Sequence, residues 1–369
     1  MLRTIRFCLL ALPFVVAMIA SRASAARLTV VAGGGDGGDG TPAPRARVVT
    51  PFGIDFAPDG DVYFVEMANG ERLRTIDAHG MLRTLAGTRA KGSSGDGGPG
   101  LQATFNGMHS LAVGTDGIVY LADTWNRRIR TYDPKTGLVQ HFAGTGAKGF
   151  AGDGGPAVRA TLGDVYCIAL DGSKENLYVA DLDNRRIRVI NLKTRVVSTV
   201  AGTGAKGIPS DDAPAAKSPL VDPRAVAVAR DGKVFILERG GHALRMINPE
   251  DGLMRTVVGT GTAGAGLADG AANRVQLDGP KHLCIDYHDD AYSVLIADTE
   301  NHRILRYSPN ADRPKVEVIA GTGRRGSAIV ESEPLRCQLF QPHGVAVHPK
   351  SGAIYIADSM NNRILKIDR

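Results

Sequence analysis

The sequence predicts an all-β protein, a six-bladed β-propeller with four-stranded blades, and three observations lead to this fold class. A strand-like run that ends in an acid recurs six times, 57 to 60 residues apart, at Glu66, Asp123, Asp181, Glu238, Asp298 and Asp358. A second run, which ends in glycine, recurs with a similar period at Gly87, Gly144, Gly202, Gly259 and Gly321. Each unit holds four short β-rich runs, and no segment shows the apolar period of a packed helix. Six units of four strands describe a ring of propeller blades.

The third unit shows how the strands are assigned. Its β-rich runs cover residues 167–170, 176–180, 186–190 and 196–201. Asp171-Gly172 separates the first two runs, and Asp-Gly pairs stand at the same place in three other units. Both residue types tolerate the dihedral angles of tight hairpin turns. Each unit is therefore expected to form one blade.

The two ends of the chain are expected to complete the last blade together. The sixth unit supplies only three strands, which begin near Pro342, Ala353 and Arg363. A fourth run, beginning at Leu28, carries the same ending as the outer strands of the other units. Its pairing with the C-terminal strands would close the ring and cover an edge that is otherwise unpaired. Residues 26–369 are thus expected to form a single domain.

Residues 1–25 have the pattern of a secretory signal peptide. Arg3 and Arg6 precede an apolar run over residues 7–20, and the small residues 23–25 suit a signal peptidase. The apolar run is short for a bilayer, so we expect a secreted or periplasmic monomer without a membrane span after cleavage. Cleavage removes three arginines and no acid, so the net charge falls from +6 to +3. The basic composition of the full sequence therefore does not indicate nucleic-acid binding, and we expect no nucleic-acid partner for an exported chain.

The chain resembles the NHL-repeat family over nearly all of the expected mature length. The likeness lies in the run GTGAKGFAGDGGPAVRATL of residues 144–162, in the strand that ends with NLYVAD at Asp181, and in NRRIR of residues 184–188. The resemblance implies a propeller. It leaves the function open, because members of this family are interaction platforms, RNA readers and, in a few branches, enzymes.

The polar residues that repeat in most units are interpreted as structural. An Asn stands three positions after the acid in most blades, and an Arg stands five positions after it in four blades, as Arg128, Arg186, Arg303 and Arg363. This spacing is expected to place the guanidinium against the carboxylate across a hairpin, with the Asn bound to turn backbone. A basic rim that includes Arg130 and Arg188, similar to that of RNA-binding NHL proteins, is the disfavoured alternative.

Two glycine-rich patterns are also interpreted as architecture. The Asp-Gly-Gly copies at Asp36, Asp96 and Asp153 have oxygens that suit calcium, but the later units lack them, and a turn bonded to its own backbone is preferred. The G-x-G-x-x-G that begins at Gly144 recurs after other strands without a following helix. Since a dinucleotide fingerprint requires that helix, we expect a hinge between blades.

Function is expected where the repeat breaks. The residue just before each inner strand differs from blade to blade, and the six connections should converge at the mouth of the central channel. These residues are Phe52, His109, Tyr166, Arg224, Lys281 and His343, with His282 beside them. We predict that they bind a protein, peptide or glycan ligand, with no cofactor.

The alternative hypothesis is a metal-dependent lyase or hydrolase. Neutral histidines bind zinc and other divalent metals, and His109, His282 and His343 are the candidate ligands, with Tyr166 and Arg224 as candidate catalytic residues. The arrangement is similar to that of peptidyl-hydroxyglycine lyases. This resemblance implies three histidines at the mouth of the channel. Blade four departs from that pattern, because Arg224 stands where the third histidine is expected. Propeller lactonases are less similar, because none of the six aligned positions is a carboxylate.

Overall fold

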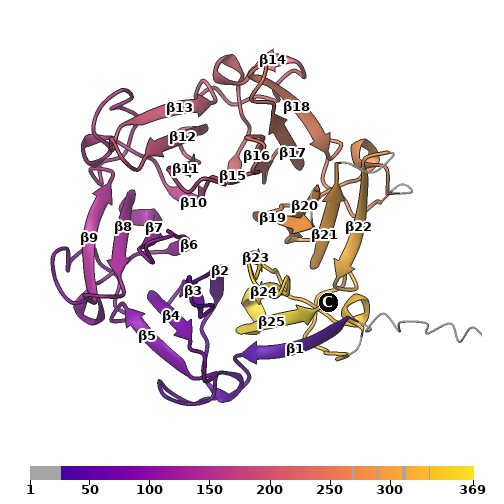
Figure 1. The fold of residues 1–369 in the computed structure, drawn as a ribbon. Helices are drawn as coiled ribbons and strands as arrows, with labels where there is room; N and C mark the ends of the chain where they lie inside the picture. The colour runs from indigo at the N-terminus through magenta and orange to yellow at the C-terminus, as the bar shows by residue number, and fades with distance from the viewer. Residues whose placement is uncertain (1–25, 268–269, 289–290, 310–312, 332) are drawn as a thin grey trace, which may run out of the picture.

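The computed structural model describes residues 26–267, 270–288, 291–309, 313–331 and 333–369. Six antiparallel sheets stand around a central axis (Figure 1). The inner strands of neighbouring blades pack against one another around this axis. No α-helix occurs in the described parts of the chain, where short 3-10 turns supply all of the helical structure. The six-bladed propeller predicted from the two repeated markers is confirmed.

The strands follow one another outward in each blade. The innermost strands are β2 (Pro51–Phe56), β6 (Met108–Val113), β10 (Val165–Leu170), β15 (Pro223–Val228), β19 (His282–His288) and β23 (Gly344–Val347). The second strands are β3 (Val62–Glu66), β7 (Val119–Asp123), β11 (Asn176–Asp181), β16 (Val234–Glu238), β20 (Ala291–Asp298) and β24 (Ile354–Asp358). The third strands are β4 (Arg72–Ile76), β8 (Arg128–Asp133), β12 (Arg186–Asn191), β17 (Ala243–Ile247), β21 (Arg303–Ser308) and β25 (Arg363–Asp368). The outer strands are β5 (Leu82–Ala86), β9 (Leu138–Ala143), β13 (Val197–Ala201), β18 (Leu253–Val258), β22 (Lys315–Ala320) and β1 (Arg27–Ala32).

Short 3-10 turns lie in the connections between these strands. They are η1 (Ala43–Arg45), η2 (Gly100–Gln102), η3 (Thr124–Asn126), η4 (Ala157–Arg159), η5 (Ala215–Lys217), η7 (Ala272–Arg274), η8 (Pro334–Arg336) and η9 (Ser359–Asn361). Blade four differs from the expected four strands, because a two-residue strand β14 (Ala213–Pro214) pairs with β18. The same contact is a single bridge in other blades, as between Pro156 and Val196.

The ring closes between the two ends of the chain. Strand β1 lies antiparallel to β25, with Leu28 opposite Ile367, and Figure 1 shows the two strands side by side. Leu28 and Ala32 have no exposed surface, so this strand also fills part of the apolar core. The predicted closure of the sixth blade by the N-terminal strand is confirmed.

The acid that ends each second strand is fully buried in all six blades, as at Asp123. In blade two its oxygens accept hydrogen bonds from the backbone N–H of Asn106 at 2.8 Å and from the side chain of Asn126 at 2.8 Å. Nδ2 of Asn126 also donates to the carbonyl oxygen of Gly92 at 2.7 Å. The repeated Asn therefore binds turn backbone, as its spacing predicts.

The arginine that faces this acid is not always the expected one. In blades five and six it is the residue five positions after the acid, as Arg303 Nε lies 2.8 Å from Asp298 Oδ2. In blade two Arg128 reaches Asp96 instead, while the buried guanidinium of Arg130 lies between Asp96 at 2.7 Å and Asp123 at 3.7 Å. Two residues further along a strand the side chain points to the same face, so either position can supply the guanidinium.

Arg188 occupies the same place as Arg130 in blade three, and neither side chain is exposed. Its Nη2 lies 2.6 Å from Asp153 Oδ1, so the Asp-Gly-Gly aspartates pair with buried arginines and not with their own turn. In blade one this role belongs to Asp39, which pairs with Arg74, and not to Asp36. Arg130 and Arg188 therefore cannot belong to a basic rim.

Gly144 illustrates why a glycine follows each outer strand. Its φ is +85°, and a Cβ atom there would lie 2.3 Å from the carbonyl oxygen of Arg127. A side chain would thus collide with the hairpin that leads from the second strand to the third. The glycine pattern marks a close approach of two backbone segments, in agreement with its interpretation as a hinge.

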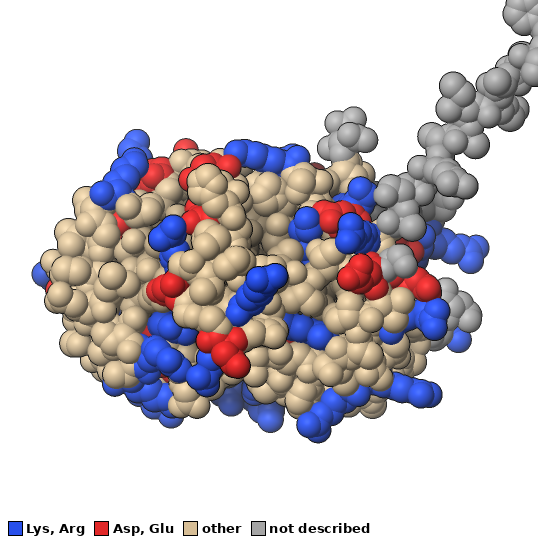
Figure 2. All heavy atoms as spheres, turned by 90° about the horizontal axis from the view of Figure 1, so that it is seen from below, with Lys and Arg blue, Asp and Glu red and all other residues tan. Residues whose placement is uncertain are grey.

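The outer surface carries charges of both signs. Figure 2 views the edge of the disc, on which Lys and Arg are interspersed with Asp and Glu. Along the lower margin Lys and Arg predominate. Of the helical segments that the structure describes, none is long and apolar enough to cross a membrane. Cys167, Cys284 and Cys337 are free thiols, and Cys167 and Cys337 are buried.

Removal of β1 should open the ring. A chain that begins at residue 33 is expected to lose at least about 3 kcal/mol of unfolding free energy, because a fully buried leucine alone contributes about 2 to 5 kcal/mol. Urea denaturation measures the change, and a chain that begins at residue 26 is the control. Equal midpoints for the two chains would contradict closure by β1.

The buried guanidinium of blade two should matter more than its exposed neighbour. Arg130→Met leaves Asp96 and Asp123 without their common partner, and removal of one member of a buried ion pair costs about 3 to 5 kcal/mol. The side chain of Arg128 is 26% exposed, so Arg128→Met should lower the free energy of unfolding by less than about 1 kcal/mol. Urea midpoints of the two variants test this order, which would be reversed if Arg128 were the partner of Asp123.

Candidate functional site

Six side chains, one from each blade, line the axis at the face where each outer strand connects to the next blade. We call them the mouth ring: Phe52, His109, Tyr166, Arg224, Lys281 and His343. In blades one to four the ring residue falls in a β-bulge between the first and second strands. A bulge leaves one residue unpaired and redirects its side chain. In blades five and six the ring residue directly precedes the paired strand.

The buried acid of each blade fixes the backbone beside the ring. Asn106 N–H donates to Asp123, Gly163 N–H to Asp181, and Phe340 N–H to Asp358, at 2.7 to 2.8 Å. Each donor stands three residues before a ring residue, and the same offset holds in the other three blades. Hydroxyl groups add contacts between blades, as Thr124 Oγ1 donates to the carbonyl oxygen of Val165 at 2.6 Å.

The ring residues touch one another around most of the axis. His343 stacks on Phe52 with 4.1 Å between ring centroids, and Phe52 meets His109 edge-on at 5.1 Å. His109 meets Tyr166 at 4.5 Å, and the guanidinium carbon of Arg224 lies 3.7 Å from the centre of the Tyr166 ring. The expected convergence of these five residues is therefore present as direct contact.

Both ring histidines direct Nδ1 to a backbone carbonyl oxygen two residues earlier in the chain. Nδ1 of His109 lies 2.7 Å from the carbonyl oxygen of Gly107, and Nδ1 of His343 lies 2.8 Å from that of Gln341. A carbonyl oxygen only accepts, so Nδ1 carries the proton and Nε2 keeps a lone pair. Burial, with the positive charges of Arg224 and Lys281 nearby, holds the pKa of both histidines well below its usual range.

Arg224 is a buried cation that no acid among the described residues contacts directly. Its residue is 5% exposed, and its Nε and Nη1 atoms have no hydrogen-bond partner in the described parts of the protein. Burial lowers the pKa of Arg224 to about 10, which leaves the group charged at neutral pH. A buried guanidinium with unpaired N–H groups is energetically costly, and an anion at this point would remove that cost.

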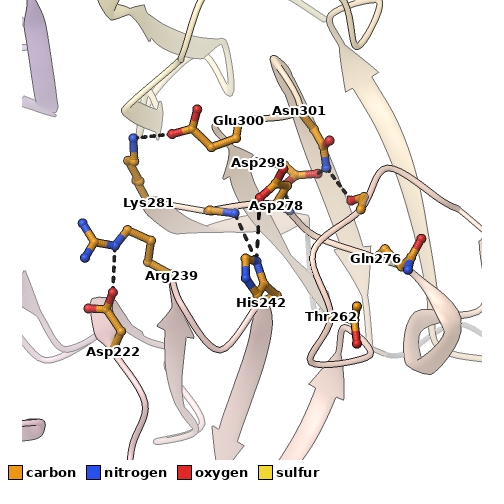
Figure 3. Close-up of polar contacts among 12 residues, drawn as sticks. Asp222, Arg239, His242, Thr262, Gln276, Asp278, Lys281, Asp298, Glu300 and Asn301 are labelled. Carbon is orange, nitrogen blue, oxygen red and sulfur yellow. Dashed lines mark hydrogen bonds and ion pairs between the residues drawn. The ribbon is translucent and has the colours of Figure 1, made fainter.

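Other cations around the ring do have partners. Figure 3 shows Arg239 turned toward Asp222 and Lys281 turned toward Glu300. Arg239 Nε lies 2.7 Å from Asp222, and Lys281 Nζ lies 2.8 Å from Glu300. Arg239 and Lys281 thus have carboxylate partners, whereas Arg224 keeps donors without a partner among the described residues.

His282 lies apart from the ring histidines. It belongs to β19, and its Nδ1 lies 3.4 Å from the backbone nitrogen of Val345. Burial lowers its pKa to about 4. It lines a channel cavity of about 390 Å³ together with Cys167 and Cys284, whereas none of the six ring residues lines this cavity.

The predicted metal ligands do not form one set. Across the described ranges, no three side chains among His, Cys, Asp and Glu are placed to hold a metal ion. His109 and His343 both contact Phe52, which stands between them in the ring. The residues present therefore do not fit a zinc centre, and the geometry supports no step through a metal. The roles of Tyr166 and Arg224 in catalysis stay predictions.

Three residues near the ring were not found from the sequence. Trp125, the only tryptophan of the chain, lies edge-on to His109 at 5.7 Å. Glu300 pairs with Lys281, and Glu71 accepts the N–H of Gly107 at 2.8 Å. Trp125 and Glu300 stand at one hairpin position that differs in every blade, so the same search for unrepeated residues would have identified them.

The neutral state of His343 predicts a specific pH dependence of stability. The unfolded chain takes up a proton at this residue near pH 6.5, whereas the folded chain does not. The stability contributed by His343 is therefore complete above about pH 7.5 and is lost as the pH falls below about 6.5. The difference in unfolding free energy between the wild type and His343→Gln, measured in urea, should shrink from pH 7.5 to 5. A difference that grows on acidification would show that the folded state binds the proton.

Two curated proteins illustrate the sequence likeness. NHL repeat-containing protein 2 of Gallus gallus is 25% identical over 334 residues, which are 81% of this chain and 45% of that protein. Teneurin-1 of Homo sapiens is 24% identical over 342 residues, which are 83% of this chain and 11% of that protein. The chain thus spans less than half the length of these relatives.

Solved structures share the fold at low sequence identity. An auxiliary nutrient binding protein from Bacteroides ovatus superposes with a TM-score of 0.68 at 15% identity, over 93% of this chain and 76% of that one. A streptogramin B lyase superposes with a TM-score of 0.53 at 13% identity, over 93% and 97% of the two chains. At these identities the likeness concerns the fold alone.

A protein-family model recognises the later copies of the repeated strand endings, hairpin Asn residues and glycine-rich connections. The model described as the Teneurin NHL domain matches residues 157–369, which is more than half of the chain. The match covers all strands of blades three to five and three of the four strands of blade six. Blades one and two repeat the same acid, glycine and ring positions. The chain belongs to the family of the Teneurin NHL domain, a family of NHL-repeat β-propellers.

Proposed function

We propose that this chain is an exported binding module that holds a protein, peptide or glycan ligand on its mouth face. The observation that carries the proposal is the contrast between a framework that repeats and a mouth ring that does not. The framework acids are hydrogen-bonded in every blade. The ring instead presents unpaired donors on Arg224 and the Nε2 lone pairs of two neutral histidines.

Such a ring suits recognition of a polar ligand. Donors and acceptors converge on the axis from several blades, and the ring residues support one another by aromatic contact, so the site is largely formed before a ligand arrives. Preformed sites lose less conformational entropy on binding. The family relation and the fold likeness to a nutrient binding protein support a binding role. Export rests on the signal pattern of residues 1–25, which lie outside the described residues.

Binding at the mouth face should depend on Tyr166. Arrays of defined glycans and peptides are screened with the labelled chain, and saturable ligands are measured again with Tyr166→Ala, which removes the ring contact to His109 and Arg224. We expect at least tenfold weaker binding, because the stacked ring both contacts ligand and orders its neighbours.

Tyr287→Ala is the matched control for this experiment. Tyr287 also carries an arginine over its ring, at 4.0 Å from Arg230, but it lines the channel cavity and not the mouth ring. Binding should change less than twofold. Ligands that lose affinity with Tyr287→Ala and keep it with Tyr166→Ala would place the site at the other end of the channel and contradict the proposal.

A further inference from the structure

Arg224 defines the ligand chemistry more closely than the ring as a whole, and this inference rests on the proposed function. We propose that Arg224 anchors a carboxylate group of an acidic peptide at the axis of the mouth ring. A planar carboxylate accepts two hydrogen bonds from a guanidinium, and such charge-assisted bonds are stronger than neutral ones.

The surroundings of Arg224 reserve its donors for an external group. The nearest acid in sequence, Asp222, is bound to Arg239 at 2.7 Å. One face of the guanidinium is covered by Tyr166 at 3.7 Å, which holds the plane of the group and leaves its edge free to donate. The two neutral histidines add no positive charge, and Lys281 is partly neutralised by Glu300.

A second cavity lies close to this site. It has a volume of about 260 Å³ and lies between blades three and four, beside the backbone that leads into Arg224. Its charged lining consists of Arg185, Lys206 and Arg239 with Asp183 and Asp222. Nε of Arg185 is a second buried donor without a partner among the described atoms. Cations therefore outnumber acids along this path, which suits further acidic residues of a peptide.

The aromatic faces of the ring argue against an acidic sugar as the occupant. A sugar ring packs well on an open aromatic face, but Phe52 is covered by His343 and Tyr166 by Arg224. Trp125 carries Lys91 over its ring at 5.4 Å. An extended peptide that presents its carboxylates edge-on requires no open aromatic face, so we assign the anion to a peptide.

The test uses N-acetyl-triglutamate and its uncharged counterpart N-acetyl-triglutamine amide. Both are titrated into the purified chain, with calorimetry for affinity and the fluorescence of Trp125 as a reporter next to His109. The acidic peptide should bind saturably and at least tenfold more tightly than the amide, and glucuronate should bind more weakly than the acidic peptide. Equal binding of acid and amide, or tighter binding of glucuronate, would overturn the assignment.

Two arginines of one blade provide a matched pair of variants. Arg224→Met should weaken triglutamate at least tenfold, whereas Arg230→Met, at the opposite end of the channel and also stacked on a tyrosine, should change it less than twofold. Arg224→Lys keeps the charge and should fall between the wild type and Arg224→Met. Unchanged affinity in Arg224→Met would refute the anchor. If Arg224→Met does not fold, the comparison of acid with amide in the wild type still tests the preference for carboxylate, and Arg224→Lys still tests the anchor.

The outcome separates this inference from the proposed function. If a ligand from the array loses affinity with Tyr166→Ala but binds Arg224→Met and the wild type with equal affinity, that result supports the mouth-face module and contradicts the carboxylate anchor. If triglutamate binding depends on Arg230 and not on Arg224, the anion site lies at the opposite end of the channel. That result would contradict both the carboxylate anchor and the mouth-face module.

Discussion

The buried carboxylate at the end of each second strand is the contact on which the rest of the structure depends. It receives a backbone N–H from the incoming connection and, in four blades, the side-chain amide of the hairpin Asn. An arginine from the third strand lies beside it in every blade. Charge-assisted hydrogen bonds of this kind are strong where water is excluded. One acid thereby holds together the hairpin, the connection and the start of the next inner strand.

This arrangement separates support from recognition. The carboxylate binds backbone three residues before the ring, so the position of the ring residue is fixed whatever its side chain is. Phenylalanine, histidine, tyrosine, arginine and lysine all occupy equivalent places. The family can therefore change its mouth chemistry without a change in the framework, which explains why membership of the family identifies the fold but not the ligand.

The repeats were sufficient to predict the propeller, the closure by Leu28 and its neighbours, and the convergence of the ring. The sequence did not distinguish Arg128 from Arg130, since both lie on one face of β8 and only packing decides which is buried. Blades five and six have Leu305 and Leu365 at the deeper position, and there the nearer arginine binds the acid. His282 was grouped with His109 and His343 because it follows Lys281 in the sequence. In the structure it lines the channel cavity instead of the mouth ring, since successive residues of a strand point to opposite sides.

The pairing of β1 with β25 also sets the order of events in folding. Leu28 and Ile367 are neighbours in the sheet but lie far apart in the sequence, so β1 has no partner until β25 has been synthesised. Loop closure over such a distance is slow. Five blades can form from local contacts, while the sixth waits with an open edge that is prone to association with other chains. A propeller closed in this way completes its sixth blade only when β1 and the three strands β23–β25 are all present.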